Sequence, residues 1–328
     1  MKKISVIGIV IVFSFFSFSS CAKKPSLPKA GSAKAEDMLT LIPKQAKGIL
    51  IVNFHRAMLT EAAKKAIKEE ENYKKYQEFT KITGIDPEKD IFFIAGAMTG
   101  KPGPTQQEGV IFLNLKYKKD VLLAAMKKQE AAIKEEDYNG ITIYSGGEGA
   151  AKRPANGAFL DDSNIILGNK EAVKAVIDVY QKKSENVLKS EELSSLIKNA
   201  NKDALLWSAL LFPLEAIKKL TDQNPMLKSL EGISSLLIYF DYKNKSLLAE
   251  IKAMSSDETK NKQLAALLNG LKVGGTLAST KDQDVADLMN KIEITSGPDH
   301  IRIYANIPED LLTKLGEKMK KEKKGEIR

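Results

Sequence analysis

Short strand-like runs and amphipathic helical stretches alternate along this chain, and they do so twice in the same order. Residues 48–54 form a compact apolar run of strand length, and from Met58 apolar residues recur every three or four positions, as in a helix. In the first half we expect strands at 48–54, 90–98, 110–117 and 138–144, a hairpin within 157–168, and helices from 58 onward, at 118–135 and at 170–182. In the second half we expect strands at 204–212, 233–242, 246–254, 292–295 and 300–307, and helices from 213, around 264–271 and 285–289, and from 308. This order predicts a duplicated βαββαββα unit.

The strands themselves indicate antiparallel pairing with one buried face. Ala249 and Ile251 alternate with Glu250 and Lys252, a period of two that is typical of a sheet with one wet side. Helices must then cover the apolar side, which gives a two-layer arrangement in each half with split βαβ character, similar to ferredoxin-like sheets. The sequence predicts an α+β fold whose antiparallel sheets are covered by helices on one face.

The amino end has the layout of an export signal. Lys2 and Lys3 precede an uncharged run over residues 4–18, which is short for a membrane-spanning helix. Cys21 is the only cysteine of the chain, so disulfide bonds within the chain are excluded. The alternative to a cleaved export signal is an uncleaved helix, with Cys21 as a small apolar residue at its end.

The segment Phe18-Ser19-Ser20-Cys21 resembles the lipobox of bacterial lipoproteins, with Phe18 in place of the usual aliphatic residue. The resemblance implies removal of the signal after Ser20 and attachment of fatty acyl chains, such as palmitate, to Cys21. Two or three acyl chains anchor a protein to a membrane durably, whereas one gives marginal binding. Because Ala22 rather than Asp follows the cysteine, the resemblance further implies the outer membrane, with the protein facing the periplasm.

Charge is concentrated at the two ends of the chain. The formal charge of the 328 residues is +9, yet residues 37–315 carry only about +1 of it, so the body is nearly neutral. A nucleic-acid module would place basic residues together on one face, and no such pattern is present, so no nucleic-acid partner is expected. We therefore expect a signal peptide (1–20), a lipidated cysteine and flexible tether (21–36), two α+β repeats (37–184 and 185–318) and a basic tail (319–328).

Short motifs in the body resemble an uncharacterised family of exported bacterial proteins, a domain of unknown function with a duplicated architecture. The motifs are Ile42-Pro43, the stretch 84–91, and Ile166-Leu167-Gly168. The resemblance implies export and this fold, and it implies no reaction.

The sequence offers little for catalysis or metal binding. His55 and His300 lack partners at metal-ligand spacing, so no metal or cofactor is predicted. His55 follows the first strand and could act as a general base at a sheet edge, although an ordinary helix-start role fits it better. Lys152 and Arg153 follow the glycine-rich stretch 146–149 and are weak candidates for binding an anionic ligand, beside the simpler reading of a mobile loop.

These observations favour a lipid-anchored protein of the bacterial cell envelope that works by non-catalytic binding or scaffolding. Its partners would be the membrane, through the anchor, and an envelope protein that the sequence does not identify. A periplasmic carrier of an apolar ligand is the alternative, and an enzyme is the third. The working surface would be the wet sheet face or a groove between the halves.

Overall fold

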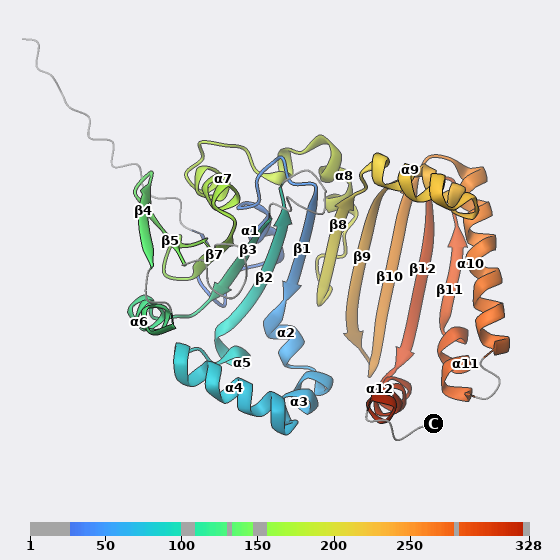
Figure 1. Cartoon of the computed structure of the whole chain (residues 1–328), viewed down its shortest axis with the longest axis horizontal. Helices are drawn as coiled ribbons and strands as arrows, with labels where there is room; N and C mark the ends of the chain where they lie inside the picture. Colours follow the sequence, from blue (N-terminus) through green and yellow to red (C-terminus); the bar gives the residue numbers. More distant parts are fainter. Residues whose placement is uncertain (1–26, 100–108, 130–132, 147–155, 279–281, 324–328) are drawn as a thin grey trace, which may run out of the picture.

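One antiparallel sheet of twelve strands runs through the whole protein (Figure 1). In the computed structural model, residues 27–99, 109–129, 133–146, 156–278 and 282–323 are described. The strand order is β11-β12-β10-β9-β8-β1-β2-β3-β7-β6-β5-β4. The α+β class and the antiparallel pairing are confirmed, but the two halves share one sheet through the β1–β8 pair instead of carrying separate sheets.

The first half supplies seven of the described strands and most of the helices at one end of the molecule. Its strands are β1 (Gly48–Asn53), β2 (Ile91–Met98), β3 (Gly109–Leu115), β4 (Lys134–Tyr138), β5 (Ile141–Ser145), β6 (Asn156–Phe159) and β7 (Asn164–Gly168). Its helices are α1 (Ala35–Leu39), α2 (Phe54–Met58), α3 (Glu61–Lys68), α4 (Glu70–Thr83), α5 (Pro87–Asp90), α6 (Lys119–Gln129) and α7 (Lys170–Tyr180). Helix α4 ends at Gly84, whose φ of 70° is left-handed, and Asp86 caps α5 just before Pro87.

The second half follows a short connection made of η1 (Val187–Lys189) and α8 (Glu191–Asn199). Its strands are β8 (Leu206–Leu211), β9 (Ile233–Lys243), β10 (Ser246–Ser255), β11 (Ile292–Ser296) and β12 (His300–Pro308). Its helices are α9 (Leu214–Gln223), η2 (Pro225–Gly232), α10 (Glu258–Ala278), α11 (Gln283–Asn290) and α12 (Glu309–Lys323).

The sheet order agrees with an internal duplication. The first-half order β1-β2-β3-β7-β6 matches the second-half order β8-β9-β10-β12-β11, and β4 and β5 are additions at the outer edge. Because β1 and β8 are antiparallel neighbours at the centre, the halves are related by an approximate twofold axis normal to the sheet. Accordingly, α3 and α4, which follow β1, lie at the lower ends of the strands in Figure 1. Helix α9, which follows β8, lies at the upper ends.

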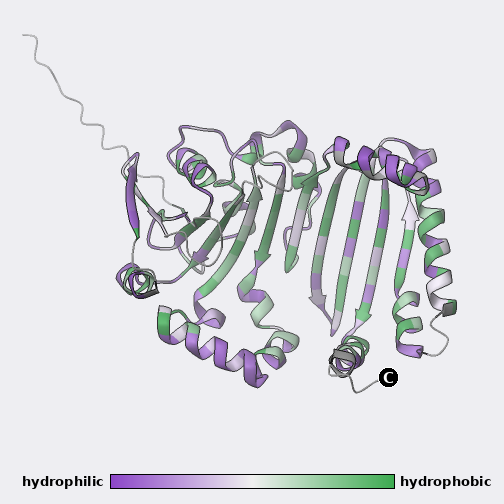
Figure 2. Ribbon diagram, viewed as in Figure 1, coloured by the Kyte–Doolittle hydropathy of each residue, from purple (hydrophilic) through white to green (hydrophobic). Residues whose placement is uncertain are grey.

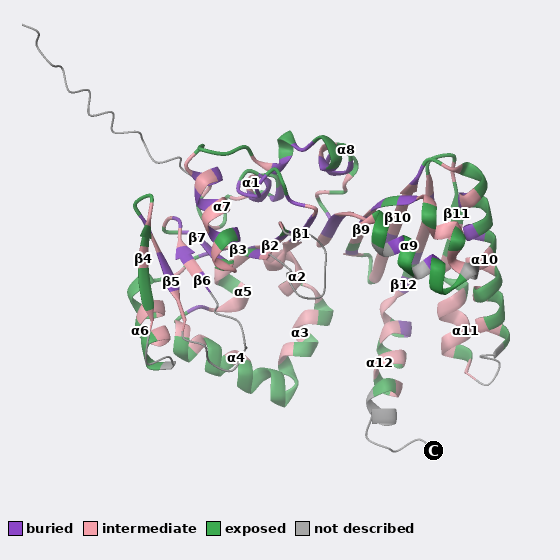
Figure 3. Cartoon of the chain, turned by 45° about the horizontal axis from the view of Figure 1, so that its top comes forward, coloured by how far each residue is buried: buried purple, intermediate pink, exposed green. Residues whose placement is uncertain are grey.

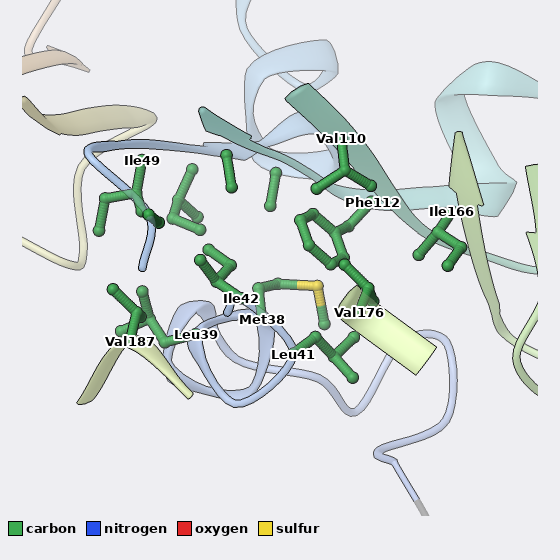
Figure 4. Close-up of a cluster of buried hydrophobic side chains, with 14 of the residues drawn as sticks. Met38, Leu39, Leu41, Ile42, Ile49, Val110, Phe112, Ile166, Val176 and Val187 are labelled. Carbon is green, nitrogen blue, oxygen red and sulfur yellow. The ribbon is translucent and has the colours of Figure 1, made fainter. Parts of the chain in front are cut away.

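The largest core lies on one face of the sheet, called here the α7 face. Strand residues Ile51, Phe112 and Ile166 are at most 1% exposed and meet helices α1 and α7. Figure 4 shows Met38 beside Val176 of α7, and Leu39 on the other side of the cluster beside Val187. Leu27 and Ala33, in the stretch expected to be a tether, also pack against this core.

The second half has its core on the opposite face, called here the α10 face. Ile217 of α9 and Leu264 of α10 pack with Ile301 of β12, and Leu311 of α12 packs against Ala305 and Ile307. In the second half the helices that follow β8 cover the α10 face, as expected, while the connecting helix α8 packs on the α7 face of β8. In the first half they cover both: α1 and α7 lie on one side of the sheet, and α4 and α6 on the other (Figure 3).

Polar residues alternate with apolar ones along β9, β10 and β12, seen as purple bands in Figure 2, and the register places them on the α7 face of the second half. Glu250, 6% exposed, accepts a 2.7 Å bond from Arg302 Nε and a 3.2 Å bond from Tyr239 Oη. Arg302 stacks on the Tyr304 ring at 4.4 Å. This is the partly wet face that the alternation predicted, and its charges are paired with one another.

Ion pairs connect the halves at the lower end of the sheet. Arg56 of α2 donates to the buried Asp241 of β9 at 2.8 Å and to the carbonyl of Asp203. Lys65 of α3 lies 2.8 Å from Glu309 of α12. Together with the shared sheet, these contacts join the repeats into one body.

Candidate functional site

An apolar groove lies on the α10 face where β8, β1, β2, β3 and β7 meet. Its volume is about 640 Å³, and it lies at the upper end of these strands in Figure 1. Its side chains are mainly aliphatic, and glycines line the rest. The lining residues are Gly48, Leu50, Gly96, Met98, Gly109, Ile111, Leu167, Gly168, Ser208 and Leu210, with parts of four neighbours.

Four large apolar side chains of this groove are open to solvent. Leu50, Met98, Ile111 and Leu167 are 37, 41, 49 and 41% exposed. They come from four adjacent strands, and the register places Ile111 opposite both Leu167 and Gly96. Apolar side chains that gather on one surface in this way mark an interaction site, whereas single exposed ones do not.

Glycines let the strands approach closely at the bottom of the groove. A Cβ atom on Gly168 would clash with the carbonyl oxygen of Gly109 on the neighbouring strand. A Cβ atom on Gly48 would lie 2.7 Å from Leu210 Cδ2. The groove is therefore hollow because its central positions lack side chains.

Among the described residues, the groove is open because no helix covers this side. In the second half, α12 follows β12 and covers the α10 face with Leu311, Leu312 and Leu315. Its counterpart α7 follows β7 but packs on the opposite face, where α1 also lies. The surface that α12 covers in one repeat is thus uncovered in the other.

An apolar cavity of about 310 Å³ adjoins the groove at Leu167. It lies between the sheet and the two helices α4 and α6, with Phe79 of α4 and Met126 of α6 on the helical side and Leu113 and Ile165 on the sheet side. No residue of α4 is buried, so this helix covers the sheet loosely.

The residues singled out from the sequence do not come together at the groove. His55 belongs to α2 and not to a sheet edge; its Nδ1 lies 3.0 Å from the Glu88 carbonyl and its ring is 5.3 Å from that of Phe92. These contacts connect the ring to α5 and β2, and a general-base role for His55 stays a prediction. Lys152, Arg153 and Cys21 lie outside the described residues.

Sequence reasoning missed the groove because its lining residues are read as ordinary strand residues. The signal that was available is Ile111, Leu113 and Leu115 on one face of β3 and Val110 and Phe112 on the other, which makes most of this strand apolar on both faces. A strand that is apolar on both faces needs two covering layers. Only the structure shows that the second layer stops at Leu113.

The described part of the chain shows no metal centre: no three of its His, Cys, Asp and Glu side chains are grouped so that they could hold an ion. No helix in the described ranges has both the length and the hydropathy to cross a bilayer.

Comparison with known proteins gives distantly similar crystal structures and a family. Crystal forms III and I of TP0453 superpose with TM-scores of 0.47 and 0.46, each at 10% identity over 84% of this chain, and the match covers 96 and 94% of those chains. No curated protein matches the sequence. The family described as "Protein of unknown function (DUF3352)" matches residues 102–319. This match covers most of the chain and extends from the β2–β3 connection to α12. The chain belongs to the DUF3352 family.

Proposed function

We propose that this protein is a lipid-anchored component of the bacterial cell envelope that binds a partner protein, without catalysis, through the apolar groove. The observation that carries the proposal is the cluster of Leu50, Met98, Ile111 and Leu167, which the protein's own helices leave uncovered. The anchor would be Cys21 at the outer membrane, with the body in the periplasm.

The internal duplication suggests what the partner presents. On the corresponding surface of the second repeat, α12 lies with Leu311, Leu312 and Leu315 against the sheet. An amphipathic helix with leucines at similar spacing fits an apolar groove by the same contacts. The partner would therefore contribute a helix, in the place where α7 is absent.

Site-specific photocrosslinking in cells tests the binding surface. A photoreactive residue at Ile111 should form an adduct of defined mass with an envelope protein. Asn306, an exposed position on the polar α7 face of β12, is the control and should give none. No adduct from Ile111, or the same adduct from both positions, would contradict the proposal.

The anchor is tested separately. Cells fed a palmitate analogue should label the full-length protein, and the Cys21→Ser variant should carry no label and should lose its membrane association. Equal labelling of both proteins would refute lipidation at Cys21.

A further inference from the structure

The cavity between the sheet and helices α4 and α6 is not used by the groove's proposed partner. Its volume of about 310 Å³ lies at the small end of the range for ligand sites, which is roughly 300–1,000 Å³. Its wall is apolar throughout, and the one threonine that lines it, Thr83, donates its hydroxyl to the Phe79 carbonyl. An apolar cavity of this kind excludes water and accepts apolar molecules.

Part of the cavity wall is aromatic, and an exposed lysine lies over one of its rings. Phe159 lines this part, with its ring centroid 5.5 Å from that of Tyr117 and 5.6 Å from that of Tyr144. Lys119 Nζ lies 5.3 Å from the Phe159 centroid, at the start of α6. Among the described residues, no ion pair includes Lys119.

The lysine and the apolar wall together would fit a ligand with an apolar chain and one negative charge. Leu115 ends β3, and Leu167 lies opposite Ile111 further back on the same strand, so a chain that reaches from one to the other would run along β3. Asp161, whose carbonyl accepts from Tyr117, is held by Ser163 N–H and Asn164 Nδ2. Its carboxylate is therefore engaged within the β6–β7 turn.

The helical cover offers a route of entry. Helices α4 and α6 meet along a seam whose apolar lining includes Ile82, Val121 and Ala125. Two lysines and two carboxylates also line it: Lys81, Lys128, Glu78 and Asp120. Ile82 and Val121 are each 37% exposed. Separation of these loosely packed helices would open the cavity without breaking the sheet.

We infer that this cavity binds a single fatty acyl chain whose anionic head group is held by Lys119. The ligand is a free fatty acid or a single-chain phospholipid, which share this chemistry. The inference does not depend on the groove's partner, although the two sites share Leu167.

Fluorescence of cis-parinaric acid, a polyene fatty acid, measures binding to the purified full-length protein. The wild type should bind it with saturation. Leu113→Trp, which fills the cavity from β3, should weaken binding about tenfold or more, and so should Met126→Trp, which fills it from α6. Thermal unfolding of both variants shows that they remain folded.

Ile111→Trp is the matched control, because Ile111 lies on the same strand and face but lines the groove instead. It should leave fatty acid binding unchanged. Absence of saturable binding by the wild type, or equal weakening by Ile111→Trp, overturns the inference. Neither result bears on the crosslinking from Ile111, so the two proposals fail separately.

The head group is tested by charge. Lys119→Gln should weaken binding of palmitate about fivefold and leave methyl palmitate unaffected, while Lys118→Gln, an exposed neighbour, should change neither. Competition by palmitate alone identifies a free fatty acid, and competition by lysophosphatidylglycerol as well extends the ligand to phospholipids. Failure of both to compete, or equal effects of Lys119→Gln on palmitate and its ester, overturns the assignment.

Discussion

At the scale of single residues, Gly168 shows how strictly the groove is built. It lies opposite Val110 of β3, and a Cβ atom there would clash with the carbonyl oxygen of Gly109, so the neighbouring backbone leaves no room for it. Gly168→Ala should therefore destabilise the protein by about 2 kcal/mol, since the strands must separate to admit the methyl group. Gly270→Ala is the control: no atom lies within 4 Å of its Cβ position in α10, so this change should stabilise by about 0.5 kcal/mol. Urea unfolding of both variants measures the difference, and equal effects would contradict the close approach of β3 and β7.

Tyr239 makes a pH-dependent contribution at the same scale. Burial and the neighbouring Glu250 raise the pKa of Tyr239 to about 12, against about 10 in the unfolded chain. A raised tyrosine pKa means that the unfolded state loses its proton first, so stability is present below pH 10 and is lost as the pH rises toward 12. Relative to Tyr239→Phe, the wild type should lose about 1 kcal/mol of unfolding free energy between pH 8 and pH 11. A constant difference between the two proteins over this range would show that Tyr239 ionises as freely as in the unfolded chain.

At the scale of elements, the ion pair between α2 and β9 holds the repeats together. Asp241 is 1% exposed and pairs with Arg56 and with Lys243, each within 2.8 Å. Arg56→Met should cost about 2 kcal/mol, because Lys243 alone then faces the buried carboxylate. Lys64→Met removes the exposed pair with Glu61 and should cost less than about 0.5 kcal/mol. Thermal or urea unfolding measures both losses of unfolding free energy. Equal losses would show that the ion pair between Arg56 and Asp241 stabilises the protein no more than an exposed pair does.

The helices and strands could largely be predicted from the sequence, but the face of the sheet that each helix covers could not. Alternation in residues 246–254 and 300–307 locates β10 and β12, and Gly84 with Asp86-Pro87 marks the end of α4. Helices α7 and α12 are both amphipathic, so the sequence shows that each packs its apolar side against the sheet. It does not show which face of the sheet each helix covers, because that depends on the other elements that pack there. Helix α7 packs on the same face as α1, and the two helices share one core. The other face of these strands is therefore without α7, and the groove lies there.

The site was equally hard to predict, for a related reason. Its residues Leu50, Ile111 and Leu167 are far apart in sequence and belong to strands whose order in the sheet is not sequential. His55 stood out because of its chemistry, yet its contacts are those of a helix-start residue. Groups made of aliphatic side chains and glycines carry no local motif.

At the scale of the whole molecule, the continuous sheet predicts one cooperative unfolding unit. Trp207, the only tryptophan, is 1% exposed on β8 at the junction of the repeats. Its fluorescence and the far-ultraviolet circular dichroism should therefore report the same urea midpoint. Two separate transitions, with the dichroism changing before Trp207 fluorescence, would indicate repeats that fold independently.

The most direct test of the groove as a binding surface is its accessibility inside and outside the cell. Ile111→Cys supplies a thiol in a chain whose own Cys21 sulfur is blocked if it is lipidated, and Asn306→Cys supplies an exposed control. With a maleimide reagent, both thiols should react readily in the purified protein, and only the thiol at Ile111 should be protected in intact envelopes. Equal reaction of that thiol in purified protein and in envelopes would mean that nothing occupies the groove.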